Sequence, residues 1–119
     1  MPRPKKWRTV CGLPESNRFG PLNTKVNHEQ FLIMTVDEYE TIRLIDLEGL
    51  TQGECAMLMD IARTTVQGIY TEARKKLAES LVKGKVLRIE GGDYKICNGF
   101  DKSCRGVGCR HRFGKNDDL

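Results

Sequence analysis

The apolar positions from Thr35 onward repeat with the spacing of an α-helix. One face of this stretch carries Val36, Tyr39, Ile42 and Ile45. Thr35 and Glu38 are spaced as a capping box, in which each side chain binds the backbone N–H of the other residue, and this signature marks a helix start. Gly49 suits a helix end, because glycine readily adopts the left-handed conformation found there. The pattern predicts a first helix between Thr35 and Gly49.

Two further helical patterns follow this first one. A second capping box, Thr51 and Glu54, precedes an apolar face of about two turns formed by Cys55, Ala56, Leu58 and Met59. After Asp60 and Ile61, a third pattern runs for roughly five turns, with apolar residues at Val66, Ile69, Tyr70, Ala73, Leu77 and Leu81. We expect a brief second helix, a tight turn and a long third helix.

The order of these helices is typical of a helix-turn-helix, here between Leu50 and Leu81, whose last helix enters the DNA major groove. When Val66, Ile69 and Ala73 face inward, the amino-terminal half of the third helix exposes polar residues. They are the predicted base contacts, Arg63, Thr64, Thr65, Gln67, Gly68 and Thr71. The predicted phosphate contacts are Thr51 and Gln52 on the second helix, with Arg74, Lys75 and Lys76 further along the third.

The chemistry of these side chains suggests individual roles. Arg63 can bond bidentately to guanine and Gln67 to adenine, while Thr64 or Thr65 suits a thymine methyl or a phosphate. Gly68 permits a close approach to DNA, at the cost of up to about 1 kcal/mol in helix stability relative to alanine. The alternative interpretation is a helical hairpin with a solvated basic face.

The literal sequence favours the DNA-reading interpretation over about 30 residues. It resembles region four of bacterial sigma factors in the segments Leu50-Thr51-Gln52-Gly53-Glu54-Cys55-Ala56, Ile61-Ala62-Arg63-Thr64-Thr65-Val66 and Ala73-Arg74-Lys75-Lys76-Leu77-Ala78. In that family an Arg-Ser-Thr-Val sequence opens the recognition helix. Ala62 departs from the pattern, because those proteins often place a capping serine there, so Asp60 or packing would have to hold the helix start. The regions of sigma factors that bind core polymerase and melt the promoter are missing from this chain, so a complete sigma factor is not expected.

A second resemblance extends from Met1 to about Cys97. It rests on Met1-Pro2-Arg3-Pro4-Lys5-Lys6, Asn17-Arg18-Phe19-Gly20-Pro21 and Thr35-Val36-Asp37-Glu38-Tyr39-Glu40-Thr41-Ile42-Arg43-Leu44. These segments are similar to a family of small uncharacterised prokaryotic proteins described as predicted DNA-binding proteins. The resemblance implies a sigma-region-four-like helix-turn-helix, and it carries no established target.

The segments around the helices show weaker patterns. Residues 1–30 are polar, contain proline and lack periodicity, which predicts an irregular basic arm. Residues 31–34 form an apolar run that fits either a strand or the lead-in to a helix. Residues 86–90 and 93–97 flank Gly91-Gly92, which predicts a tight β-hairpin. Such a hairpin is either a wing that contacts the DNA backbone through Lys85, Arg88 and Lys95, or an element that only closes the core.

Charge is sorted along the chain. The net charge is +4, yet residues 36–60 hold seven acids and one base, whereas residues 63–85 hold six bases and two acids. Residues 1–8 carry four bases and residues 102–115 carry five, with no acid in either stretch. This sorting suits a polyanionic partner, because each neutralised phosphate releases condensed counterions. A solvated surface is the alternative.

Length and hydropathy indicate one compact cytoplasmic domain. A chain of 119 residues suits a single modest core. No stretch approaches the roughly 20 apolar residues of a membrane span, and the basic amino terminus lacks the apolar segment of a secretory signal. We expect no membrane partner.

Cysteines raise the question of a metal. The five cysteines are an odd number, which does not fit a disulfide framework. Four of the candidate ligands have the spacing C-x6-C-x4-C-x-H, namely Cys97, Cys104, Cys109 and His111. Thiolates and imidazole suit tetrahedral zinc, whereas an all-cysteine set with Cys11 in place of His111 suits zinc or an iron–sulfur cluster. Free thiols in a basic tail are the alternative, and Cys55 is expected to be a core residue.

The sequence as a whole predicts a mainly α fold. We expect a three-helix helix-turn-helix core with a wing-like hairpin at residues 31–97, a basic irregular arm at 1–30 and a Cys/Gly-rich basic tail at 98–119. Catalysis is not expected, since the chain has no Gly-rich phosphate loop, metalloprotease pattern or nucleophile elbow. The predicted function is sequence-specific binding of double-stranded DNA in transcription regulation, with a metal- or redox-responsive tail and paired half-sites compatible with a homodimer. The alternative is a protein-interaction module that binds a transcription partner such as RNA polymerase.

Overall fold

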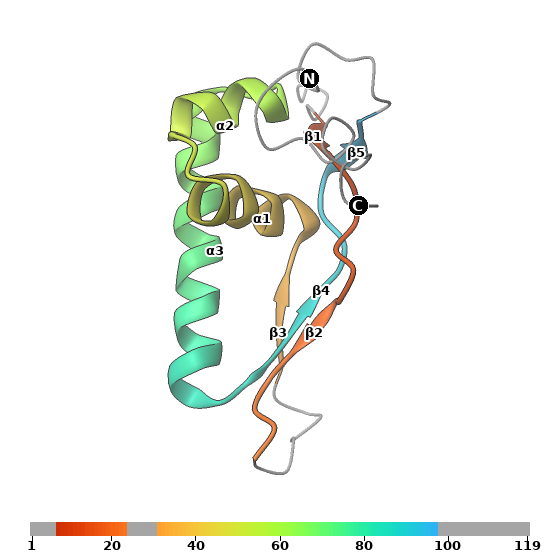
Figure 1. The fold of residues 1–119 in the computed structure, drawn as a ribbon, viewed down its shortest axis with the longest axis vertical. Coiled ribbons are helices and arrows are strands. Elements are labelled where there is room, and N and C mark those ends of the chain that lie inside the picture. Colours follow the sequence, from red (N-terminus) through yellow and green to blue (C-terminus); the bar gives the residue numbers. More distant parts are fainter. Residues whose placement is uncertain (1–6, 24–30, 98–119) are drawn as a thin grey trace, which may run out of the picture.

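The computed structural model describes residues 7–23 and 31–97 of the chain (Figure 1). The helices are α1 Val36–Thr41, the π-helical segment η1 Ile42–Leu47, α2 Gln52–Met59 and α3 Arg63–Lys83. The strands are β1 Arg8–Val10, β2 Arg18–Phe19, β3 Phe31–Met34, β4 Val86–Ile89 and β5 Tyr94–Ile96. The described part of the chain therefore consists of three main helices and two small sheets.

Both predicted capping boxes are confirmed. The Thr35 hydroxyl accepts from the Glu38 backbone N–H at 3.3 Å, and the Glu38 carboxylate accepts from the Thr35 N–H at 2.9 Å. Thr51 and Glu54 make the same two bonds at 3.1 and 2.9 Å. Each box satisfies N–H groups that a helix start leaves unpaired, which fixes where α1 and α2 begin.

The first predicted helix has the expected extent and a different geometry in its second half. Gly49 follows it with a φ of 80°, as expected of a helix-ending glycine. Residues Ile42–Leu47 form a π-helix, which begins directly after the Thr41 hydroxyl donates to the Glu38 carbonyl at 2.7 Å. Such a bond competes with the regular backbone ladder, so it favours a change of helical geometry at this point.

The hydrophobic core lies where α1 and α2 pack against α3. The predicted apolar face of α2 is confirmed, because its four residues are all buried, Cys55, Ala56, Leu58 and Met59. Of the predicted apolar residues of α3, Val66 and Ala73 are fully buried, and Ile69, Tyr70 and Leu77 are partly buried. The prediction for Leu81 is wrong, since its side chain is 86% exposed. The carboxyl-terminal end of α3 continues past α1 and α2, so neither helix covers Leu81 (Figure 1).

A three-stranded sheet covers another side of the core. Its order is β2-β4-β3, with β4 antiparallel to β2 and parallel to β3. Alternate residues of β4 and β3 face inward, so Leu87, Ile89 and Met34 are buried. Residues 31–34, which the sequence leaves between two interpretations, are therefore a strand.

The predicted irregular arm is wrong for residues 8–10 and 18–19, which are strands β1 and β2. β1 pairs in parallel with β5, and Val10 is fully buried in the core. These strands are too short for alternation to be visible in the sequence, and their partners lie more than sixty residues away along the chain.

The predicted hairpin at Gly91-Gly92 is wrong in its pairing. Strands β4 and β5 occur at the expected residues, but β4 pairs with β2 and β3, whereas β5 pairs with β1. The two glycines, with φ of 74° and 107°, turn the chain past the start of α1, where the Gly91 carbonyl accepts from the Val36 N–H at 2.9 Å. A Cβ at Gly92 would lie 2.8 Å from the Thr35 Cβ, so the close approach requires glycine.

Candidate nucleic-acid interface

The amino-terminal half of α3 has a buried side and an exposed side. Val66 faces the core with no exposed surface. The exposed residues include five of the six predicted base contacts, Arg63, Thr64, Gln67, Gly68 and Thr71, while Thr65 is half-buried. The predicted division into inward and outward residues is therefore confirmed in this half of the helix. We call these six residues the α3 polar face.

The α3 polar face is free to contact a partner. Among the residues that the structure describes, Arg63 has no ion pair and Gln67 has no side-chain hydrogen bond. Gly68 is open, because a Cβ there would meet nothing within 4 Å. Guanidinium and amide groups without protein partners on a rigid helix are available for hydrogen bonds to an external ligand.

The start of α3 has no side-chain cap. Ala62 occupies the N-cap position, and its carbonyl accepts from the Val66 N–H at 3.1 Å. Asp60 does not take over this role, since it ends α2 in the left-handed conformation with a φ of 57°. Buried Ile61 and Val66 on either side of the cap hold the helix start by packing. The first N–H groups of α3 consequently remain open to solvent or to an anion.

The predicted phosphate contacts divide into paired and unpaired side chains. Lys76 Nζ lies 2.6 Å from Glu38 Oε1, and this half-buried ion pair ties α3 to α1. Arg74 lies 4.0 Å from Asp46 and over the ring of Tyr70, yet its side chain is 64% exposed. The exposed Lys75 has no ion pair with any described residue.

The two candidates on α2 are more confined than expected. Thr51 is exposed, but its hydroxyl oxygen accepts from the Glu54 N–H at 3.1 Å in the capping box. Gln52 is half-buried. Arg74 and Lys75 are thus the two predicted phosphate contacts with the most accessible charge.

A buried ion pair, which the sequence interpretation missed, joins α1 to η1 and to the residue after β1. Glu40 and Arg43 are 1% and 6% exposed. The Arg43 Nε and Nη2 donate to the Glu40 carboxylate at 2.9 and 3.0 Å, and the backbone N–H of Cys11 donates to the same carboxylate at 2.9 Å. The i,i+3 spacing of Glu40 and Arg43, the one base among residues 36–60, was the available signal.

Burial by itself lowers the pKa of Arg43, but the hydrogen bonds and the negative charge of Glu40 outweigh it, and the pKa is raised above its ordinary value. Arg43 therefore stays charged, and it needs the Glu40 carboxylate as its partner.

The candidate metal ligands are only partly within the described residues. Cys11 and Cys97 are buried together, and the Cys97 N–H donates to the Val10 carbonyl at 2.7 Å. Cys104, Cys109 and His111 lie outside the described residues. Within residues 7–23 and 31–97, no three potential ligands gather around one point. The metal site stays a prediction.

Cys55 is confirmed as a core residue. It is fully buried, and its thiol lies 3.6 Å from the Met59 sulfur. Burial, with the charge of Glu40 as a further cause, raises the pKa of the Cys55 thiol to about 12. The thiol is protonated at neutral pH, so it is unreactive and a poor metal ligand.

None of the helices that the structure describes is both long and apolar enough to cross a membrane.

Comparison with known proteins confirms that the chain belongs to an uncharacterised family. Residues 1–97 match the family described as Protein of unknown function DUF134. A UPF0251 protein of Desulfitobacterium hafniense strain Y51 is 69% identical over 94% of this chain and 89% of its own length. The UPF0251 protein of Caldanaerobacter subterraneus subsp. tengcongensis is 47% identical over 96% of this chain and 95% of its own. No solved structure matches the chain significantly. The chain therefore belongs to this family, and the names of these relatives specify no ligand.

Proposed function

We propose that this member of the DUF134 family is a sequence-specific DNA-binding protein that regulates transcription by placing the amino-terminal half of α3 in the major groove. The observation that carries the proposal is the α3 polar face. It combines an arginine and a glutamine that bond to no other side chain among the described residues, small residues beside them, and the fully buried Val66 on the opposite side. Those are the side chains that read base edges when a helix lies in the groove.

The arrangement of α2 and α3 supports this proposal. Only residues 60–62 separate the two helices, which pack against each other, and the left-handed Asp60 makes the turn. In a helix-turn-helix the first of the two helices crosses the DNA backbone while the second enters the groove with its amino-terminal residues. Here the α3 polar face is turned away from the buried Val66 side of that half, so it can contact DNA without unfolding of the core.

Individual side chains take the roles that their positions allow. Arg63 pairs with guanine and Gln67 with adenine, and Thr64 or Thr71 contacts a thymine methyl or a phosphate. Arg74 and Lys75 contact phosphates one to two turns further along. We assign Lys76 to the ion pair with Glu38, since a phosphate contact would break a half-buried pair of 2.6 Å.

Titration of a random-sequence DNA duplex with the full chain, followed by fluorescence anisotropy at several salt concentrations, tests the proposal. The two charged phosphate contacts, Arg74 and Lys75, predict that the affinity falls roughly tenfold between 50 and 200 mM salt. The proposal would be contradicted if the duplex affinity did not change with salt concentration, or if no duplex binding occurred at 50 mM salt. Capture of RNA polymerase that persists at 200 mM salt, without duplex binding, would support the protein-interaction alternative.

A further inference from the structure

The outer face of the three-stranded sheet is both basic and apolar. Leu87 and Ile89 of β4 point into the core, so the alternate residues Val86 and Arg88 face outward. The strand register places Arg18 of β2 and Phe31 of β3 on the same outer face. This face lies on the other side of the molecule from the start of α3 (Figure 1).

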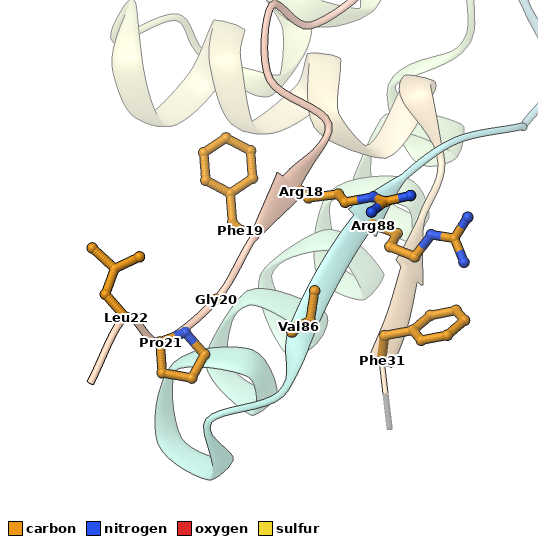
Figure 2. A pocket seen from close by; sticks show the side chains of 8 residues that line it. All are labelled: Arg18, Phe19, Gly20, Pro21, Leu22, Phe31, Val86 and Arg88. Atoms are coloured by element: carbon orange, nitrogen blue, oxygen red, sulfur yellow. The ribbon is translucent and has the colours of Figure 1, made fainter. Parts of the chain in front are cut away.

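Two arginines lie directly opposite each other on this face. Arg18 and Arg88 are paired residues in the antiparallel register of β2 and β4. Figure 2 shows both guanidinium groups extending in the same direction across β4. Like charges in this position repel each other and destabilise a sheet. An anion held between the two guanidiniums would remove that repulsion.

Arg88 is held in place and Arg18 is not. The Arg88 guanidinium lies 4.6 Å from the centre of the Phe31 ring, and its Nη2 lies 3.0 Å from a Glu90 carboxylate oxygen. Arg18 is exposed and has no ion pair with a described residue. One oriented guanidinium and one available guanidinium suit a bidentate oxyanion such as phosphate.

A pocket of about 350 Å³ adjoins the two arginines, and none of the eight described residues that line it is acidic. The lining beside the charges is apolar and comes from Phe19, Pro21, Leu22, Phe31 and Val86 (Figure 2). Gly20 makes the wall possible, because a Cβ there would lie 3.0 Å from the Val86 side chain. The volume is near the lower end of the range for small-molecule sites.

We propose that this pocket binds a nucleoside phosphate, with the phosphate between Arg18 and Arg88 and the base against the apolar wall near Phe31. The charged end of the pocket selects phosphate, and flat aromatic and guanidinium surfaces favour a planar base. The small volume selects a single nucleotide. The site shares no residue with the α3 polar face, so the proposal does not depend on DNA binding.

Isothermal titration of the full chain with adenosine monophosphate, in phosphate-free buffer at low salt, tests the site. The nucleotide is expected to bind at least about tenfold more tightly than inorganic phosphate or adenosine alone, because only the nucleotide uses both ends of the pocket. Arg18→Gln and Arg88→Gln each lower the affinity about tenfold, the usual effect of losing a charged hydrogen bond. Lys95→Gln, an equal loss of charge on β5, leaves it unchanged.

Phe31→Leu separates stacking from charge. This variant keeps an apolar side chain, and it is expected to bind inorganic phosphate as before while losing the advantage of the nucleotide. The proposal would be overturned if wild type and Arg18→Gln bound the nucleotide equally, or if no saturable binding occurred at millimolar nucleotide. It would also be overturned if benzoate bound more tightly than the nucleotide. If a single-stranded oligonucleotide bound more tightly than the nucleotide, the proposal would also be wrong, and this face would be a binding surface for nucleic acid. Duplex titrations of Arg18→Gln test DNA binding separately, since that variant keeps the α3 polar face intact.

Discussion

The basic side chains near the start of α3 differ from those at its contact with α1. At the start, Arg63 is exposed and has no ion pair with a described residue. At the contact, Lys76 is paired with Glu38, whereas Arg74 stays 64% exposed although it lies 4.0 Å from Asp46. The acids of residues 36–60 thus neutralise part of the basic stretch that the sequence assigns to DNA. Ion pairing separates the bases that stabilise the fold from those available to a polyanion.

The largest effect on stability is expected at the buried ion pair between Glu40 and Arg43. Glu40→Gln leaves Arg43 buried and charged without its main partner. We expect a loss of about 3 kcal/mol in the free energy of unfolding, measured by urea denaturation. Glu48→Gln removes an exposed carboxylate 3.6 Å from the same arginine, and it should cost less than about 1 kcal/mol. Equal effects of the two substitutions would show that burial does not set the strength of these pairs.

Neighbouring lysines on α3 test the comparison directly. Lys76→Gln breaks the pair with Glu38 and should lower stability by about 1 kcal/mol, with no change in the salt dependence of duplex binding. Lys75→Gln should leave stability unchanged and reduce the slope of log affinity against log salt by about 1. Urea denaturation and salt titrations of both variants measure the two effects. If Lys76→Gln alone reduced the slope, the division into structural and DNA-binding bases would be wrong.

A smaller effect is expected at Gly68, within the α3 polar face. The position is helical and open, so Gly68→Ala should raise stability by about 0.5–1 kcal/mol. If the missing side chain allows a close approach to DNA, the same substitution lowers duplex affinity. Thermal denaturation and anisotropy on one sample measure the two changes. If Gly68→Ala raised both stability and duplex affinity, the proposal that Gly68 allows a close approach to DNA would be wrong.

Local signals in the sequence predicted the helices well. The Thr35–Glu38 and Thr51–Glu54 boxes lie within four residues of chain, and they appear in the structure as expected. The outward position of Arg63 followed from the same local periodicity. These features depend on neighbours along one helix, which a single sequence displays.

Pairings between distant segments could not be predicted. The Gly91-Gly92 pair has the composition of a hairpin turn, yet it turns the chain against α1, and β5 finds its partner in β1. Leu81 fits the apolar spacing of α3, but whether a neighbour covers it depends on where the other helices end. The ion-pair partners of Arg74 and Lys76, and the position of Arg18 opposite Arg88, also depend on tertiary contacts, so they became visible only in the structure.

The most direct test of the DNA-reading proposal is selection of bound duplexes from a random-sequence pool, with wild type and with the double variant Arg63→Ala, Gln67→Ala. Wild type should enrich one defined sequence. The double variant should enrich none while keeping the weak, salt-dependent binding that Arg74 and Lys75 supply. Enrichment of the same sequence by both proteins, or of none by wild type, would contradict the assignment of the α3 polar face as the surface that reads DNA.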